Sequence, residues 1–316
     1  MTQTTQSPLP LFKSDAGKAR YMAAYDAALD DWPVPYEELD LPTRLGGTRV
    51  IASGAPTAPP LLLLPSFAGS ATVWRLNIAG VSRHYRTYAI DVIGQPGKSV
   101  ATQRIRNRQD FANWLTDVLD GLGIRRTSIV GCSFGGFLAL NQPLLTPERI
   151  ERVVLISPVG TFASQYCKLF YAMRVRAPIQ RLMRRARGNK PGRSLADLRQ
   201  KGVPFGPPRD AKWAALMAVT MSEAPSVSII SASVFSKAQL RAIRAPTLLL
   251  IGEKERLYEP HATLKLAQER MPGLAGAIVP GADHIAAMAQ ADDINERIIR
   301  FLQQSAGATG AGAKPN

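Results

Sequence analysis

Near its middle the chain reads Ile129-Val130-Gly131-Cys132-Ser133-Phe134-Gly135-Gly136. An apolar run that predicts a buried strand enters this stretch, and the apolar residues 137–140 that follow it predict a helix. Gly131, Ser133 and Gly135 match the G-x-S-x-G pattern, in which a sharp strand-to-helix turn exposes a serine. Side chains two residues either side of that serine would collide, which explains the glycines. The alternative is a glycine-rich turn with a structural serine.

Short apolar runs and helical patterns alternate on both sides of this turn. Strands are predicted at residues 61–64, 86–91, 127–131, 152–156, 246–252 and 276–279. Helices are predicted at residues 15–32, 71–84, 105–122, 135–142, 262–270 and 294–304. The succession predicts a mostly parallel, twisted sheet with helices on both faces. We also expect Pro143 to stop the helix after the serine, and residues 36–41 and 48–53 to form a hairpin that turns at Gly46-Gly47.

The alternation is interrupted between residues 158 and 244. This segment, called the cap below, is predicted to be a mostly helical insertion in a core of residues 1–157 and 245–304. A tail rich in Gly and Ala, residues 305–316, is expected to be disordered.

The cap carries most of the chain's formal net charge of +15. Thirteen lysines and arginines lie between Lys168 and Lys212, against Asp197 and Asp210. A solvated helix face is the favoured interpretation, and a surface that attracts anionic substrates, acidic partners or a membrane is the alternative. Because no nucleic-acid-binding motif accompanies the charge, nucleic-acid binding is not expected.

The 316 residues are enough for one large α/β domain with an insertion. Two cysteines, Cys132 and Cys167, form neither a disulfide framework nor a metal-binding spacing. The N-terminus lacks the basic and apolar regions of a signal peptide, and no apolar run reaches the ~20 residues of a membrane-spanning helix. We therefore expect a cytoplasmic protein without a transmembrane segment.

A serine hydroxyl becomes a nucleophile when a base accepts its proton, and an acid must orient that base. On a sheet of this kind the partners follow in the order serine, acid, histidine, in loops at the carboxyl ends of strands. His84 precedes the serine, and His261 follows the penultimate strand too closely. His284 directly follows the last predicted strand and is the predicted base.

The acid is expected just after the strand at residues 246–252. Glu253, Glu255 and Asp283 compete for the role. Glu255 lies in the turn past the strand, where its carboxylate can reach the far nitrogen of His284. Glu253 is closer to the strand end and is interpreted as a turn residue, so Glu255 is preferred.

Two backbone amides are expected to hold the negative oxygen that forms in the reaction. One is the amide of Phe134, which directly follows the serine. The other is predicted in the loop after the strand at residues 61–64, where Phe67 is the candidate donor.

Together these features resemble the α/β-hydrolases, and more narrowly the bacterial carboxylesterases related to naproxen esterase. The narrower resemblance lies in Trp32-Pro33-Val34-Pro35-Tyr36-Glu37, Tyr88-Ala89-Ile90-Asp91-Val92-Ile93-Gly94, Asn113-Trp114-Leu115, Gly252-Glu253-Lys254-Glu255 and Tyr258-Glu259-Pro260-His261. It implies a Ser–Glu–His triad of Ser133, Glu255 and His284 that hydrolyses esters, including bulky aryl-propionate esters, without a cofactor. Many α/β-hydrolases have His-Gly where this chain has Pro65-Ser66, a departure that concerns the second oxyanion donor.

The sequence thus predicts a serine carboxylesterase that acts on small-molecule esters through an acyl-enzyme and needs neither a cofactor nor a metal. Another serine-dependent hydrolase is the alternative: a lactonase, a carbon–carbon bond hydrolase or a cofactor-free perhydrolase. A non-catalytic binding protein on the same scaffold is a third hypothesis, disfavoured because all three triad residue types are present.

Overall fold

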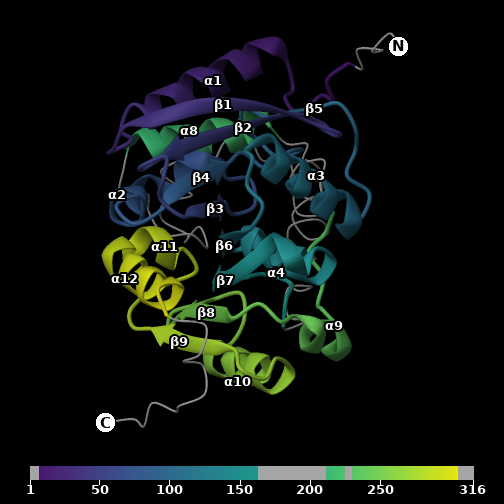
Figure 1. The fold of residues 1–316 in the computed structure, drawn as a ribbon. Helices are drawn as coiled ribbons and strands as arrows, with labels where there is room; N and C mark the ends of the chain where they lie inside the picture. Colours follow the sequence, from purple (N-terminus) through teal and green to yellow (C-terminus); the bar gives the residue numbers. More distant parts are fainter. Residues whose placement is uncertain (1–6, 163–210, 225–229, 305–316) are drawn as a thin grey trace, which may run out of the picture.

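The computed structural model describes residues 7–162, 211–224 and 230–304. Within these residues the strands form one sheet in the order β1-β2-β4-β3-β6-β7-β8-β9, with β5 paired to β2 (Figure 1). The strands are β1 (Tyr36–Thr43), β2 (Gly46–Ser53), β3 (Pro60–Leu64), β4 (Arg86–Ile90), β5 (Val100–Ala101), β6 (Thr127–Cys132), β7 (Ile150–Ile156), β8 (Thr247–Gly252) and β9 (Ala275–Val279). Pairing is antiparallel from β1 to β4 and parallel from β4 to β9, which confirms the mostly parallel sheet.

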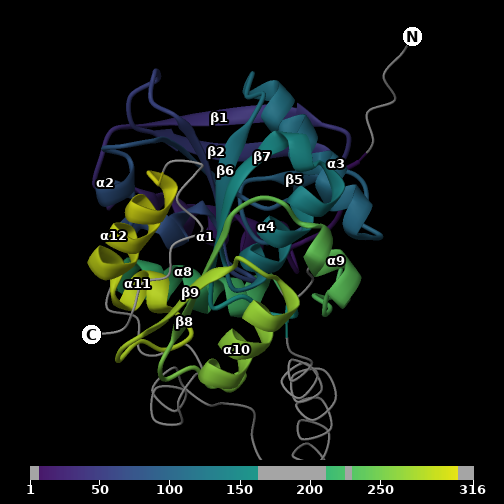
Figure 2. The same cartoon turned by 60° about the horizontal axis from the view of Figure 1, so that its bottom comes forward.

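Helices cover both faces of this sheet (Figures 1 and 2). One face packs against α1 (Asp15–Leu29), η1 (Ala71–Leu76), α2 (Ile78–Val81), α8 (Ala211–Glu223), α11 (Ala286–Ala289) and α12 (Ala291–Leu302). The other packs against α3 (Arg108–Gly121), α4 (Phe134–Leu145), α9 (Lys237–Ala242) and α10 (Pro260–Arg270). A short 3-10 turn, η2 (Pro147–Arg149), leads into β7.

The sequence of β3 is apolar because both of its faces are covered. Leu61 and Leu63 enter the core on the α12 side, whereas Leu62 and Leu64 enter the core on the α4 side. Successive side chains of a strand point to opposite faces, so a strand covered on both sides has no position for a polar residue.

The hairpin exists, but the prediction that it turns at Gly46-Gly47 is wrong. Thr43 pairs with Gly46 across the two strands, so the turn consists of Arg44 and Leu45. Gly46 instead begins β2 with φ of 127°, and a Cβ there would lie 2.1 Å from the carbonyl oxygen of Val100. A glycine is needed here because β5 approaches the backbone closely. No local sequence pattern indicates that approach.

Two helix predictions also need correction. The helix expected at residues 71–84 is divided into η1 and α2 at Asn77, whose buried side chain donates to Asn295 Oδ1 of α12 at 3.0 Å. Pro143 does not stop α4, which continues to Leu145. Because Pro143 lies in the last turn, its missing N–H costs α4 a single hydrogen bond near an end.

The cap lies mostly outside the described residues, including the stretch from Lys168 that holds its lysines and arginines, and so does Cys167. Its described part includes α8, which lies beside α1 (Figure 1). Arg20 of α1 forms an ion pair with Glu223 of α8 at 2.7 Å, and the Lys13 amide donates to the Glu223 carbonyl at 2.9 Å. This end of the cap is therefore attached to the N-terminal helix. The division into core, cap and tail stays a prediction.

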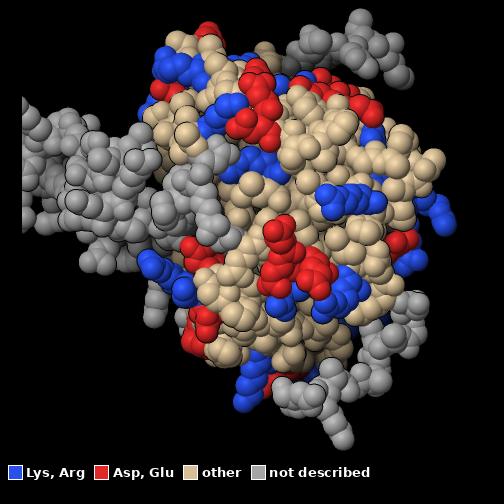
Figure 3. All heavy atoms as spheres, turned by 90° about the vertical axis from the view of Figure 1, so that its left-hand side faces the viewer, with Lys and Arg blue, Asp and Glu red and all other residues tan. Residues whose placement is uncertain are grey.

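Charge is mixed on the face that carries α2, α11 and α12. Basic and acidic side chains of the described residues are interspersed there (Figure 3). Within the described ranges, no helix is long and apolar enough to cross a membrane.

Candidate active site

Ser133 lies at the junction of β6 and α4, on a strained turn. Its φ of 53° and ψ of −113° fall in a region that non-glycine residues rarely occupy. The turn is held because the Ser133 amide donates to the Ile156 carbonyl at 2.9 Å and the Ser133 carbonyl accepts the Gly136 amide at 3.0 Å. The side chain therefore stands at the carboxyl end of β6, before the first turn of α4.

The glycines beside Ser133 allow backbone segments to meet. A Cβ on Gly131 would lie 2.2 Å from the Gly135 carbonyl oxygen, and one on Gly135 would lie 2.2 Å from the Leu64 carbonyl oxygen. The turn after β6 is thus pressed against the end of β3. This contact places the start of α4 beside the loop that follows β3, residues 65–70, called the β3 exit loop.

The structure brings Ser133, His284 and Glu255 into one hydrogen-bonded chain. His284 Nε2 lies 2.9 Å from Ser133 Oγ, and His284 Nδ1 lies 2.6 Å from Glu255 Oε2. Ser133 is 5% exposed, His284 is 2% exposed and the Glu255 side chain is fully buried. Such short contacts in a site shielded from water hold the imidazole in one orientation.

Glu255 is held by its own loop, residues 253–258, called the β8 exit loop. Glu255 Oε1 accepts the amides of Arg256 and Leu257, both at 2.8 Å, which leaves Oε2 for His284. A carboxylate can only accept hydrogen bonds, so the His284 tautomer that pairs with a Glu255 carboxylate has its proton on Nδ1 and directs Nε2 at Ser133 Oγ. This is the arrangement that a general base requires.

The two competing acids occupy other roles. Glu253 is exposed and accepts the Gly281 amide at 2.7 Å, as expected of a turn residue. Asp283 accepts the Ile285 amide at 3.0 Å, two residues along its own chain. The hydrogen bonds described for these two carboxylates go to backbone amides, whereas the carboxylate that contacts His284 Nδ1 is that of Glu255.

Gly252 joins the loop of the acid to the loop of the histidine. A Cβ there would lie 2.4 Å from the Asp283 carbonyl oxygen, and the Lys254 amide donates to the Ala282 carbonyl at 2.7 Å. Sequence reasoning missed this function of Gly252. Its position at a strand end, directly before the acid, was the available signal.

Two other groups near Ser133 could in principle act as nucleophiles, the Cys132 thiol and the Tyr258 hydroxyl. Burial and the nearby charge of Glu255 raise the pKa of the Cys132 thiol to about 12. The same two causes, burial first, raise the pKa of the Tyr258 hydroxyl well above its ordinary value. Both groups therefore stay protonated at neutral pH, and Ser133 alone of these three has a base within hydrogen-bond reach.

The two candidate oxyanion donors lie on adjoining segments. Phe134 is the first residue of α4, and Phe67 lies in the β3 exit loop. Their rings meet edge to face with centroids 6.3 Å apart. Among the described residues, neither amide has a hydrogen-bond acceptor, and the positive end of α4 adds to the field at Ser133.

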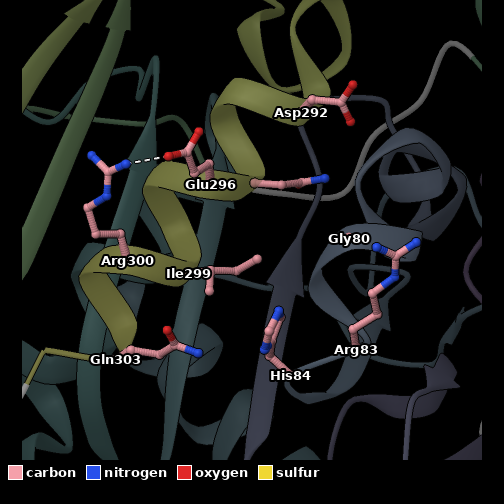
Figure 4. A pocket seen from close by; sticks show the side chains of 9 residues that line it. Gly80, Arg83, His84, Asp292, Glu296, Ile299, Arg300 and Gln303 are labelled. Carbon is pink, nitrogen blue, oxygen red and sulfur yellow. Dashed lines mark hydrogen bonds and ion pairs between the residues drawn. The ribbon is translucent and has the colours of Figure 1, made fainter.

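The other two histidines lie away from this chain of hydrogen bonds. His261 is exposed at the start of α10. His84 is exposed and borders a hollow of about 490 Å³ between the end of α2 and α12 (Figure 4). Arg300 and Glu296 form an ion pair in the same hollow. Within the described ranges, no group of His, Cys, Asp and Glu side chains could hold a metal ion.

The fold and this site define the class of the protein. A family model described as the α/β hydrolase fold matches residues 59–290, and the chain belongs to this family.

Two curated relatives from Bacillus subtilis (strain 168) match nearly the whole chain. "Uncharacterized carboxylesterase nap" is 35% identical over 298 residues, which cover 93% of this chain and 95% of the relative. "Carboxylesterase YbfK" is 34% identical over 90% of this chain and 93% of the relative.

Solved structures agree with these relatives. The crystal structure of naproxen esterase (carboxylesterase NP) from Bacillus subtilis has a TM-score of 0.77 and 31% identity, with 92% of this chain and 99% of that chain covered. The carboxylesterase CesB (YbfK) from the same organism has a TM-score of 0.76 at 31% identity, and covers 92% and 99% of the two chains. The protein is a carboxylesterase-type hydrolase.

Proposed function

We propose that the protein hydrolyses carboxylic esters of small molecules through an acyl-enzyme on Ser133. The observation that carries the proposal is the unbroken chain from Glu255 through His284 to Ser133, with contacts of 2.6 and 2.9 Å. Glu255 orients His284, and His284 Nε2 is the base for the Ser133 hydroxyl. Two carboxylesterase relatives of similar length support the same chemistry.

The reaction has two halves in this proposal. Ser133 Oγ attacks the acyl carbon while its proton passes to His284 Nε2, and the carbonyl oxygen becomes an oxyanion held by the amides of Phe134 and Phe67. The protonated imidazole then gives its proton to the departing alcohol, leaving the acyl group on Ser133. Water, deprotonated by His284, attacks the acyl-enzyme, and the proton returns to Ser133 as the acid leaves.

The substrate class follows from the relatives. One solved relative is named naproxen esterase, so we propose aryl-propionate esters among the substrates. Lactones, carbon–carbon bond substrates and perhydrolysis remain the alternative chemistries for the same triad. A panel of p-nitrophenyl esters, naproxen methyl ester, lactones and diketones distinguishes them.

The predicted cytoplasmic location, the independence from cofactors and the absence of nucleic-acid binding are kept as predictions.

Two measurements test the proposal directly. Ser133→Ala should lower kcat for p-nitrophenyl butyrate by about 10³-fold or more, and a fluorophosphonate probe should label the wild type on Ser133. Ser128→Ala is the matched control, because Ser128 lies at the opposite end of β6 and is also buried. Turnover retained by Ser133→Ala, or a label on another residue, would refute the triad. No turnover and no label in the wild type would favour the non-catalytic hypothesis.

A further inference from the structure

The β3 exit loop carries one proposed oxyanion donor, yet few hydrogen bonds within the loop stabilise its shape. Inside the loop the Gly69 amide donates to the Ser66 carbonyl at 3.0 Å. Ala68, directly after Phe67, has φ of 57°, a left-handed conformation that costs a non-glycine residue roughly 1–2 kcal/mol. A strained loop of this kind keeps its shape only when surrounding groups hold it.

Gln95 is the first of these surrounding groups. It belongs to the loop after β4, residues 91–99, called the β4 exit loop. Gln95 is fully buried, and its Oε1 accepts the Ala68 amide at 2.7 Å. Because a backbone N–H can only donate, this contact fixes which end of the Gln95 amide faces the loop. It holds the peptide bond between Phe67 and Ala68.

Asp91 is the second group. It is fully buried at the end of β4, where Oδ1 accepts the Ala71 amide and Oδ2 accepts the Lys98 amide, both at 2.7 Å. The Ser99 hydroxyl donates to the Asp91 carbonyl at 2.6 Å. Asp91 thus ties Ala71, the residue directly after the β3 exit loop, to both ends of the β4 exit loop.

The Phe134 donor depends on different contacts. It is placed by the turn after β6, where Gly135 meets the end of β3 without a side chain between them. The Phe67 donor has no equivalent support within its own segment. Its distance from Phe134 therefore also depends on how firmly the β4 exit loop holds Ala68 and Ala71.

We infer that Gln95 and Asp91 are positioning residues, which hold the β3 exit loop so that the Phe67 amide meets the oxyanion formed at Ser133. This inference rests on the proposed function and deepens it, because it assigns a role to two buried polar side chains that the triad does not use. Gln95 acts at Ala68, next to the donor, and Asp91 acts at the far end of the loop. Gln95 therefore has the larger influence on catalysis.

Gln95→Met tests the inference, because methionine fills a similar volume but offers no acceptor comparable to an amide oxygen. One oxyanion donor contributes about 10²–10³ in kcat, so a displaced donor should lower kcat by about 10- to 100-fold. KM should change by less than about 3-fold, because the substrate carries no oxyanion before Ser133 attacks it. A trifluoromethyl ketone, which forms a hemiketal oxyanion on Ser133, should bind more weakly by a similar factor.

Gln142→Met is the matched control. Gln142 is a buried glutamine in α4 whose Nε2 donates to the Thr146 hydroxyl at 2.8 Å, away from the β3 exit loop. The Gln142→Met variant should have a lower melting temperature than the wild type, and its kcat should fall by no more than about 2-fold. If Gln95→Met does not fold, Gln95→Asn replaces it, because asparagine is one methylene too short to reach Ala68.

The outcomes separate this inference from the proposed function. Unchanged kcat and unchanged ketone affinity in the Gln95 variant would overturn the inference, and so would an equal loss of kcat in Gln142→Met. Fluorophosphonate labelling and turnover of the wild type test the proposed function independently. Wild-type turnover with an unaffected Gln95 variant removes only the positioning role.

Discussion

The β8 exit loop and the β3 exit loop both place a group at Ser133, but they are stabilised in opposite ways. In the β8 exit loop, Glu255 is held by the amides of the next two residues, and its own amide donates to the Gly252 carbonyl at 3.1 Å. The β3 exit loop and the residue after it instead depend on side chains of the β4 exit loop, which lie 27 and 20 positions further along the chain. Local hydrogen bonds form with the turn itself, whereas remote ones form only when the sheet is assembled.

The two loops therefore differ in which substitutions can displace the group that each of them carries. The Glu255 carboxylate is held by amides of its own loop, and that loop also contacts the loop of His284. The Phe67 donor, in contrast, can be displaced from three separate places: the β3 exit loop, the β4 exit loop and the turn after β6. Variants at those places should therefore affect the donor without affecting the acid.

The largest effect is expected from the β8 exit loop. Glu255→Gln places an amide NH₂ opposite either His284 Nδ1–H or the amides of Arg256 and Leu257, so one donor faces another. The imidazole then loses its orientation and the wrong tautomer is favoured. We expect kcat for p-nitrophenyl butyrate to fall by about 10³- to 10⁴-fold.

Glu253→Gln is the control in the same loop. Glu253 is exposed and its Oε2 accepts the Gly281 amide, a contact that a glutamine oxygen can retain. Its kcat should stay within about 3-fold of the wild type. A larger loss in Glu253→Gln than in Glu255→Gln would show that the acid has been misassigned.

The second effect concerns the contact between the turn after β6 and the end of β3. In Gly135→Ala the added Cβ would lie 2.2 Å from the Leu64 carbonyl oxygen and 2.5 Å from that of Pro65. The two segments must separate, so we expect a loss of about 3 kcal/mol in the free energy of unfolding. Urea unfolding monitored by circular dichroism measures it, and kcat should fall because both donors move.

Gly47→Ala provides the comparison for that substitution. A Cβ on Gly47 of β2 would meet no heavy atom within 4 Å, and alanine reduces the entropy of the unfolded chain. Its free energy of unfolding should be equal to the wild-type value or higher by up to about 1 kcal/mol. Equal destabilisation by the two alanines would contradict the importance of the close approach.

The smallest effect is a pH dependence at Asp91. Burial raises the pKa of this carboxyl to about 6, and the hydrogen bonds from the Ala71 and Lys98 amides oppose the shift only in part. The folded state therefore binds the proton more tightly than the unfolded state does. The stability that this gives is fully present below pH 3.8, the ordinary pKa, and is lost as the pH rises to about 6.

Asp91→Asn removes this titration. The wild type should gain stability relative to the variant when the pH is lowered from 7 to 4, by up to about 3 kcal/mol. Urea unfolding of both proteins at the two pH values measures the difference. A stability difference that is independent of pH, or that shrinks at pH 4, would be inconsistent with a raised pKa at Asp91.

Much of this architecture was predictable because the decisive patterns are local. The leucines of β3, the strand entering the turn at Ser133 and the helix leaving it follow from runs of a few residues. The chain order of Ser133, Glu255 and His284 predicted their convergence, because the carboxyl ends of parallel strands meet at one edge of a sheet. The structure brings those three side chains together, while their catalytic roles remain our proposal.

The predictions that were wrong and the residues that were missed have a common cause. Gly46-Gly47 looked like a turn, but Gly46 accommodates β5, and the helix at residues 71–84 is divided where Asn77 meets Asn295. Asp91 was noted only within a stretch that resembles the carboxylesterases, and nothing in the sequence around Gln95 indicated a role for it. In each case the partner lies far away in the sequence, so no short window contains both residues.

By itself, the sequence determined the strand–turn–helix around Ser133, the order of the sheet-end loops and the residue types available for nucleophile, acid and base. These depend on apolar periodicity and turn chemistry, which act over a few residues. The tertiary structure alone decided that Glu255 rather than Glu253 reaches His284. It also decided that Gly135 abuts the end of β3 and that Asp91 and Gln95 hold the β3 exit loop. Those outcomes depend on distances between segments, which exist only after the sheet has brought the loops together.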